Sequence, residues 1–249
     1  MLRLVFLSVT ILLLPSIAAA QPVTGPYLSG EGGVNFGGST LTLHGATDIN
    51  VDSGPLGIGA IGWGFGNGLR TELEGSYRSN DVAGINTLRV DGFRLPLTNV
   101  AGNVATEALM ANVFYDIPVQ PFDLPVQPYF GAGLGYEWSQ FNTSGNGFGT
   151  IPLGLNNSVT GPDTVSFGNG SAFAYQAIAG LSVPIQAVPR LNLTLEYRFF
   201  GTANAVVPVA RTIPGIVVNG AVPTSTTNNN FSLGENALLI GFRYSLGAP

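Results

Sequence analysis

Apolar and polar residues alternate with a period of two in one segment after another of this chain. Residues 69–78, LRTELEGSYR, set apolar or neutral positions against Arg70, Glu72, Glu74, Ser76 and Arg78. Only 9% of the chain is charged, whereas charged residues make up about 25% of a typical globular domain. Because successive side chains of a β-strand point to opposite faces, this alternation predicts a strand with one apolar face and one charged face.

Eight segments show this alternation, and each has nine to twelve residues. They are residues 27–36, 56–65, 69–78, 107–116, 128–138, 172–183, 191–199 and 237–246. A strand of about 9–11 residues crosses a bilayer when tilted by about 45°, whereas strands of soluble proteins average about 5–6 residues. The segments therefore have the length of membrane-crossing strands.

The connections between these segments alternate between short and long. Short connections are expected at residues 66–68, 117–127 and 185–189, and long polar loops at 38–54, 80–104, 140–171 and 202–235. Outer-membrane barrels have short periplasmic turns and long extracellular loops. The sequence thus predicts an all-β fold, an eight-stranded antiparallel up-and-down transmembrane β-barrel with long extracellular loops and short periplasmic turns.

The two faces of the predicted strands differ in chemistry. Aromatic residues near strand ends are expected to form two girdles on a lipid-facing surface: Tyr27, Phe36, Tyr77, Tyr115, Trp138, Phe173, Tyr197, Phe199 and Tyr244. The opposite face is expected to form an ionic network inside the barrel: Glu31, Arg70, Glu72, Glu74, Arg78, Glu137, Glu196, Arg198 and Arg243.

Three observations favour a closed ionic interior. All nine basic residues are Arg, the residue that pairs carboxylates through a planar fork in confined sites. An eight-stranded barrel is only just wide enough for side chains to fill it. Small inward residues, Gly131, Gly133, Gly180 and Gly241, would leave room for long Arg and Glu side chains. A soluble lipocalin-like barrel with an apolar interior is the alternative.

The first twenty residues have the pattern of a secretory signal peptide. Arg3 precedes an apolar run from Leu4 to Leu14, and three small residues, Ala18–Ala20, fit a cleavage site. We expect residues 1–20 to be cleaved and residues 21–249 to form the barrel; a retained N-terminal anchor is the alternative.

Composition and motifs argue against several other functions. A formal net charge of −5 argues against nucleic-acid binding, and the absence of Cys excludes thiolate metal sites. The motif GIGAIG at 57–62 matches a dinucleotide fingerprint, but the following WGFGNG cannot form the required helix. We expect no cofactor and no metal.

Two groups of residues are candidates for catalysis. His44 lies in a predicted loop near Asp48 and Asp52 and could serve a rim enzyme, although a lone loop His is usually just solvated. Glutamates of the predicted interior could act as acid–base pairs, but neighbouring Arg residues favour structural ion pairs. We therefore expect no catalytic residue.

An ordered set of segments resembles the small OmpA-like outer-membrane proteins, and in particular the opacity-protein-like, porin-family β-barrels of Gram-negative bacteria. The segments are LRTELEGSYR, ALMANVFYDIPV, VQPYFGAGLGYEW, FAYQAIAGLSVPI, LNLTLEYRFFG and ALLIGFRYSLG. The resemblance implies outer-membrane residence, contact with lipid and lipopolysaccharide, and insertion by the barrel-assembly machinery. Two features depart from the family pattern: Leu246 stands where a terminal aromatic is preferred, and we expect the protein to lack a C-terminal peptidoglycan-binding domain.

These inferences lead to three functional hypotheses. The first is a non-enzymatic barrel with a plugged ionic lumen, which contributes to envelope structure or to surface contact with an unknown extracellular ligand through its loops. The second is a small porin-like channel for water, ions or minor solutes. The third is a rim enzyme. We expect a monomer.

Overall fold

Every regular element that the structure describes is a β-strand. The structure is a computed structural model, and it describes residues 23–36, 40–43, 47–85, 88–90, 93–95, 97–118, 126–154, 157–212, 222 and 224–247. The predicted signal peptide and His44 lie outside these ranges. Within them, no helix is long and apolar enough to cross a membrane.

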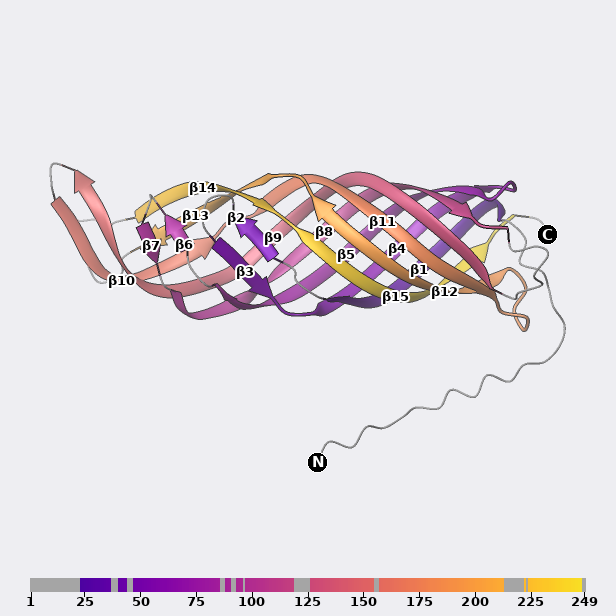
Figure 1. The fold of residues 1–249 in the computed structure, drawn as a ribbon, viewed down its shortest axis with the longest axis horizontal. Helices are drawn as coiled ribbons and strands as arrows, with labels where there is room; N and C mark the ends of the chain where they lie inside the picture. The colour runs from indigo at the N-terminus through magenta and orange to yellow at the C-terminus, as the bar shows by residue number, and fades with distance from the viewer. Residues whose placement is uncertain are drawn as a thin grey trace, which may run out of the picture.

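Eight antiparallel strands close into a ring that follows the order of the sequence. The strands are β1 (Thr24–Phe36), β4 (Gly54–Phe65), β5 (Leu69–Ile85), β8 (Leu97–Asp116), β9 (Gln127–Gly154), β11 (Gly170–Pro184), β12 (Leu191–Thr202) and β15 (Gly234–Ser245). Each strand pairs with the next, and β15 returns to pair with β1. The predicted eight-stranded up-and-down barrel is confirmed, and Figure 1 shows its elongated shape.

Tight turns join strands at one end of this barrel. The turn between β4 and β5 has positive φ angles at Gly66 (75°) and Gly68 (91°), which glycine adopts without steric cost. The turn between β11 and β12 ends at Arg190, whose φ is 71°. The third predicted short connection lies mostly outside the described residues.

In their described parts, the predicted long loops contain further strands, which the sequence did not predict. β2 (Thr40–Leu43) pairs with β3 (Thr47–Val51), and β13 (Ala205–Thr212) pairs with β14 (Thr224–Ser232). β10 (Asn157–Phe167) pairs with the last part of β9. A small hairpin, β6 (Leu88–Val90) with β7 (Phe93–Leu95), lies between β5 and β8. Strands β8 and β9 reach 20 and 28 residues, longer than predicted.

These hairpins continue the barrel as a second closed ring. Its pairings run β9–β10–β13–β14–β2–β3–β5–β8 and return to β9. Figure 1 places β10, β13, β14 and β2 together at the end opposite the tight turns and the C-terminus. We call this part of the barrel the upper ring.

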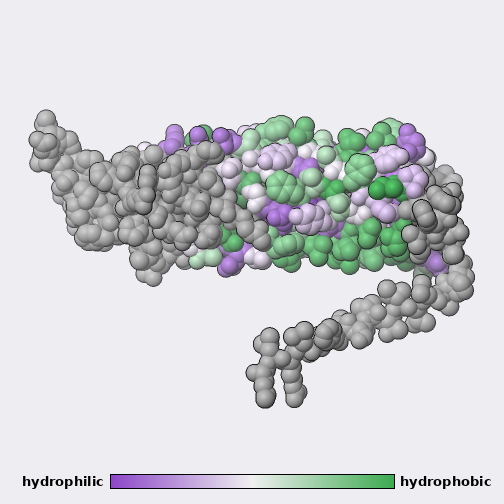
Figure 2. Space-filling model, viewed as in Figure 1, coloured by the Kyte–Doolittle hydropathy of each residue, from purple (hydrophilic) through white to green (hydrophobic). Residues whose placement is uncertain are grey.

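We call the part of the barrel between the upper ring and the tight turns the lower barrel. Large apolar side chains cover its outside. Ile61, Leu134 and Ile240 each expose between 58% and 59% of their surface, and hydrophobic residues spread widely over the face in Figure 2. A soluble barrel would bury such residues. The outward position of apolar side chains excludes the lipocalin-like alternative and agrees with the predicted lipid-facing surface.

The polarity of the two faces reverses along a single strand. On β9, Tyr136 and Trp138 face outward and Glu137 faces inward. Further along the same strand, Phe141 faces inward and Asn142 faces outward. On β5, Tyr77 faces outward, but beyond it the outward residue is Asp81. An apolar exterior suits lipid and an apolar interior suits water. The reversal therefore marks the boundary between bilayer and water at Tyr77 and Trp138.

Tyr27 corrects the predicted aromatic girdle. It was expected to face lipid, but only 1% of its surface is exposed and its hydroxyl donates a hydrogen bond to Glu72 at 2.7 Å. Leu28, its neighbour on β1, faces outward instead. Strand parity, rather than aromatic character, decides on which face a side chain lies.

A charge placed on the lipid-facing surface should destabilise the barrel. Leu195 on β12 is 46% exposed, and Leu195→Arg is expected to lower the unfolding free energy by about 2–4 kcal/mol if the residue lies near the bilayer midplane. Urea titration of protein refolded in lipid vesicles measures this change. Ser166→Arg, an outward position of the upper ring, should change stability by less than about 0.5 kcal/mol. Equal effects of the two substitutions would contradict the face assignment.

Candidate functional site

The structure places all nine charged residues predicted for the interior inside the barrel. Their exposed fractions are 9% or less: Glu31, Arg70, Glu72, Glu74, Arg78, Glu137, Glu196, Arg198 and Arg243. They come from β1, β5, β9, β12 and β15. Alternation along each of these strands turns the charged side chains toward the axis and the apolar ones outward.

Arg198 is the centre of the network. Its guanidinium contacts carboxylates from three strands: Glu74 on β5 at 2.6 Å, Glu196 on β12 at 2.6 Å, and Glu31 on β1 at 3.3 Å. The planar fork of Arg can serve several carboxylates at once, which a single ammonium group does less well. One side chain thus links three strands across the lumen.

Neutral donors satisfy the remaining oxygens of these carboxylates. Gln176 donates at 3.3 Å to the Glu74 oxygen that Arg198 does not contact, and Asn112 donates at 2.7 Å to the oxygen that Arg198 does contact. The Tyr129 hydroxyl donates to Glu196 at 2.6 Å, and Thr194 donates to Glu31 at 3.2 Å. Buried charges are tolerated when their hydrogen-bonding capacity is filled in this way.

A second cluster lies nearer the tight turns. Arg70 donates to Asp116 at 3.0 Å and to Glu72 at 3.2 Å, and its guanidinium lies 4.6 Å from the ring centre of Phe114. Arg243 donates to Ser182 at 3.0 Å. Stacking on aromatic faces adds to the stabilisation of a desolvated guanidinium.

A third cluster lies toward the upper ring. Arg78 donates to Glu235 at 2.8 Å, and its guanidinium lies 3.7 Å from the ring centre of Phe200. Asn35 donates to Asn80 at 2.7 Å. Glu137 is fully buried and accepts a hydrogen bond from Ser139 at 2.6 Å.

The sequence prediction missed two carboxylates of the interior. Asp116 and Glu235 are 1% and 3% exposed, and each pairs with an Arg. Asp116 lies an even number of residues from Met110 and Asn112 on β8, so strand alternation could have predicted that it faces inward. Glu235 lies within a segment that was predicted to be a loop. The described interior therefore holds seven carboxyl groups and four guanidiniums, so carboxyl groups outnumber guanidiniums there.

Inward glycines make room mainly for rings. A side chain at Gly131 would collide with Phe114, and one at Gly180 would collide with Tyr129. Of the four glycines predicted to accommodate charged chains, only Gly241 faces one, Glu31. The expectation that these glycines leave space was right, but most of the space is occupied by neutral groups.

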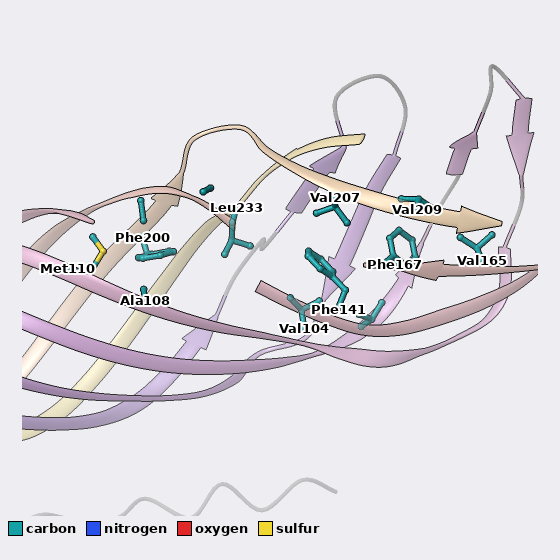
Figure 3. Packing of buried hydrophobic residues seen from close by; sticks show 13 residues of the cluster. Val104, Ala108, Met110, Phe141, Val165, Phe167, Phe200, Val207, Val209 and Leu233 are labelled. Carbon is teal, nitrogen blue, oxygen red and sulfur yellow. The ribbon is translucent and has the colours of Figure 1, made fainter. Parts of the chain in front are cut away.

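Toward the upper ring the interior becomes largely apolar, which the sequence did not predict. Figure 3 shows this apolar core, which extends from Met110 and Phe200 to Val165 and Val209 of the upper ring. It consists of Val82, Val104, Ala108, Met110, Phe141, Val165, Phe167, Ala172, Ala174, Phe200, Val207, Val209 and Leu233. Phe141, Phe167 and Val209 are at most 7% exposed. A packed core of this kind leaves few voids larger than a water molecule.

The structure gives the other candidate sites little support. Residues of the GIGAIG motif lie in β4, with Gly57 and Gly59 facing outward, so the dinucleotide reading is excluded. Among the described residues, no group of three potential metal ligands is found. His44, the residue proposed for a rim enzyme, lies outside the described residues.

Comparison with known proteins identifies the class. A family model for the outer membrane protein beta-barrel domain matches residues 4–244. An outer membrane protein of Gluconacetobacter diazotrophicus is 30% identical over 98% of this chain, which spans 64% of that relative's length. The chain belongs to the outer-membrane-protein β-barrel family, and it resides in the outer membrane.

The fold is also similar to that of a solved structure. The outer membrane protein OprG from Pseudomonas aeruginosa has a TM-score of 0.50 at 16% identity, covering 92% of this chain and 99% of that one. Neisserial surface protein A has a TM-score of 0.44 at 16% identity, covering 90% and 99%. At this level of identity, the likeness to OprG concerns the fold alone.

Removal of the central guanidinium should destabilise the barrel strongly. Arg198→Met keeps most of the side-chain volume but leaves three buried carboxylates without their cation, and the unfolding free energy is expected to fall by about 3–5 kcal/mol. Urea titration in lipid vesicles measures the loss. Arg190→Gln, at an exposed turn position, should change stability by less than about 0.5 kcal/mol. A similarly small effect at Arg198 would show that the network contributes little to stability.

Proposed function

We propose that this protein is a non-enzymatic, closed outer-membrane barrel that supports the cell envelope or makes contacts at the cell surface. The observation that carries the proposal is the filling of the lumen. Ion pairs centred on Arg198 cross the axis, and the apolar core above them contains fully buried Val165 and Val209. A steady flow of solute would have to break both barriers.

The buried carboxylates support a structural role rather than catalysis. Glu74 and Glu196 are each held by Arg198 and by a neutral donor. A general acid or base must reach its substrate, whereas these two groups are 1% and 4% exposed. Their contacts favour the proposal of a non-enzymatic barrel with a structural ionic network.

The upper ring favours a role in surface contact. Many of its described outward residues are polar, including Asn142, Ser166, Asn228 and Asn230, although Val206 is an exposed apolar residue. Its interior is apolar. A closed ring with a packed core is more rigid than four independent loops. We propose that it holds an extracellular binding surface clear of the bilayer, for a ligand whose identity is open.

Membership of the family supports a proposal about how the chain reaches the membrane. We expect the barrel-assembly machinery to insert the chain, despite Leu246 at the end of the last strand, and we expect a monomer surrounded by lipid and lipopolysaccharide. Unboiled protein should migrate differently from boiled protein on a detergent gel, because a folded barrel resists unfolding by detergent alone.

A small channel is the second candidate, and the excess of carboxylates favours it. With seven carboxylates and four guanidiniums in the described interior, any passage would attract cations. If the protein is a channel, it should therefore select cations over anions.

Electrical recordings distinguish the closed barrel from the channel. Purified full-length protein in planar bilayers is expected to give no stable openings in potassium chloride, because the ionic and apolar barriers lie in series. Stable, cation-selective openings that change on Arg243→Ala, and remain unchanged on the exposed control Arg190→Ala, would favour the channel and overturn the closed barrel.

A further inference from the structure

One carboxylate lies on the outside of the barrel at the boundary between bilayer and water. Glu107 on β8 is exposed, and its neighbours across the strands are Tyr77 on β5 and Trp138 on β9. Both aromatic side chains face outward, with 51% and 45% of their surfaces exposed. Of the Arg side chains that the structure describes, four point into the lumen and Arg190 lies in a tight turn at the other end. Glu107 thus stands in the aromatic girdle with no described basic group beside it.

The position of Glu107 decides which charges surround it. This step rests on the proposed function, which places the upper ring outside the cell and therefore places the boundary at Glu107 in the extracellular leaflet. Lipopolysaccharide fills that leaflet, and its lipid A base carries phosphate groups at this depth. A carboxylate and a phosphate repel each other, unless a cation that binds both lies between them. Calcium and magnesium ions take oxygen ligands of both kinds.

A polar hollow extends from Glu107 toward the water. Its volume is about 690 Å³, and Trp138, Gln140, Asn169 and Ser171 line it as well. Amide and hydroxyl groups offer oxygen ligands to a cation, and their N–H and O–H groups can donate to phosphate or sugar oxygens. Among the described residues, no group of three potential metal ligands is found. A cation at Glu107 therefore needs oxygens from a second molecule to complete its coordination.

An apolar hollow extends from Glu107 in the opposite direction, toward the middle of the bilayer. Its volume is about 520 Å³; Trp138 lines it too, and Gly57, Gly59 and Gly75 lie along it. A side chain built at any of these three glycines would meet no atom within 4 Å, so the backbone there is open to an acyl chain. The two hollows follow one another along the wall in the same order as the acyl chains and the phosphorylated sugars of a glycolipid.

We propose that Glu107 binds the lipid A part of one lipopolysaccharide molecule through a shared divalent cation. The cation lies between the Glu107 carboxylate and a lipid A phosphate, and Gln140 and Asn169 contact the remaining phosphate or sugar oxygens. An acyl chain covers the glycines of the apolar hollow. Calcium suits this site better than magnesium, because calcium accepts irregular sets of about 6–8 oxygens whereas magnesium requires near-ideal octahedral geometry.

Terbium luminescence tests the cation site directly. Terbium ions replace calcium at oxygen sites and emit light when a nearby excited indole transfers energy to them. The chain contains only two Trp residues, so Trp63→Phe leaves Trp138, which lines both hollows, as the donor. The full-length protein is refolded into phosphatidylcholine vesicles with or without diphosphoryl lipid A. Lipid A should lower the half-saturating terbium concentration about two- to fivefold, the effect expected of one exposed charge contact. Calcium chloride should displace terbium at lower concentration than magnesium chloride.

Matched variants separate the headgroup contact from the acyl contact. Glu107→Gln should abolish the effect of lipid A, while Asp81→Asn, which changes an exposed acid that lines neither hollow, should keep it. Gly75→Leu fills the apolar hollow without a clash and should also abolish the effect. Gly234→Leu, equally free of clashes but on β15 and outside both hollows, should not. The gel shift on heating verifies that each variant is folded.

Three results would overturn the proposal. One is equal terbium affinity with and without lipid A. Another is an effect of lipid A that persists in Glu107→Gln, which would assign the signal to terbium bound elsewhere on the vesicle. The third is an effect that monophosphoryl or dephosphorylated lipid A reproduces in full. Because lipid A is present in both leaflets of these vesicles, the signal depends neither on the orientation of the barrel nor on conductance, so failure here leaves the closed barrel standing.

Discussion

The contacts of Arg198 depend on a constraint that lipid imposes on the whole barrel: apolar side chains face outward, so polar side chains must satisfy one another inside. Burying a charge is costly unless it is paired and hydrogen-bonded. A guanidinium that reaches Glu31, Glu74 and Glu196 meets this demand with one residue. The absence of Lys from the chain agrees with this, because a compact and strongly hydrated ammonium is less suited to bridging carboxylates in a dry, narrow space.

Beyond the bilayer, the same strands are surrounded by water instead of lipid. Along β9, even-numbered residues face outward on both sides of the boundary, but they change from Tyr136 and Trp138 to Asn142, while inward residues change from Glu137 to Phe141. The backbone pattern is continuous, and only the chemistry of its two faces is exchanged. Polar outward residues keep the upper ring in water, and its apolar interior packs as in a soluble protein. The girdle residues Tyr77 and Trp138 lie at the boundary between the parts of these strands that face lipid and the parts that face water.

Strand parity explains what could be predicted from the sequence. In the lower barrel, alternation was strong, so it predicted eight strands and an inward position for residues such as Arg70 and Glu196. Tyr27 was misplaced because its aromatic character was given more weight than its parity. The sequence does not predict the strands of the upper ring, because Gly, Asn and Thr weaken the alternation there and many outward residues are polar. Glu235 was missed for the same reason. Which Glu approaches Arg198 could not be predicted either, since Glu74 lies 124 positions away and the contact depends on closure of the ring.

The many glycines of the chain follow from the same geometry. The interior contains more carboxylates than guanidiniums, so phenol and amide groups must donate the remaining hydrogen bonds, as Tyr27 does to Glu72 and Tyr129 to Glu196. The rings of these two tyrosines fit into the narrow lumen because the facing residues, Gly62 and Gly180, have no side chain. Outward glycines such as Gly59 have no such role, because nothing approaches them from within the chain. Outside the barrel, the missing side chains leave backbone open to the surrounding lipid.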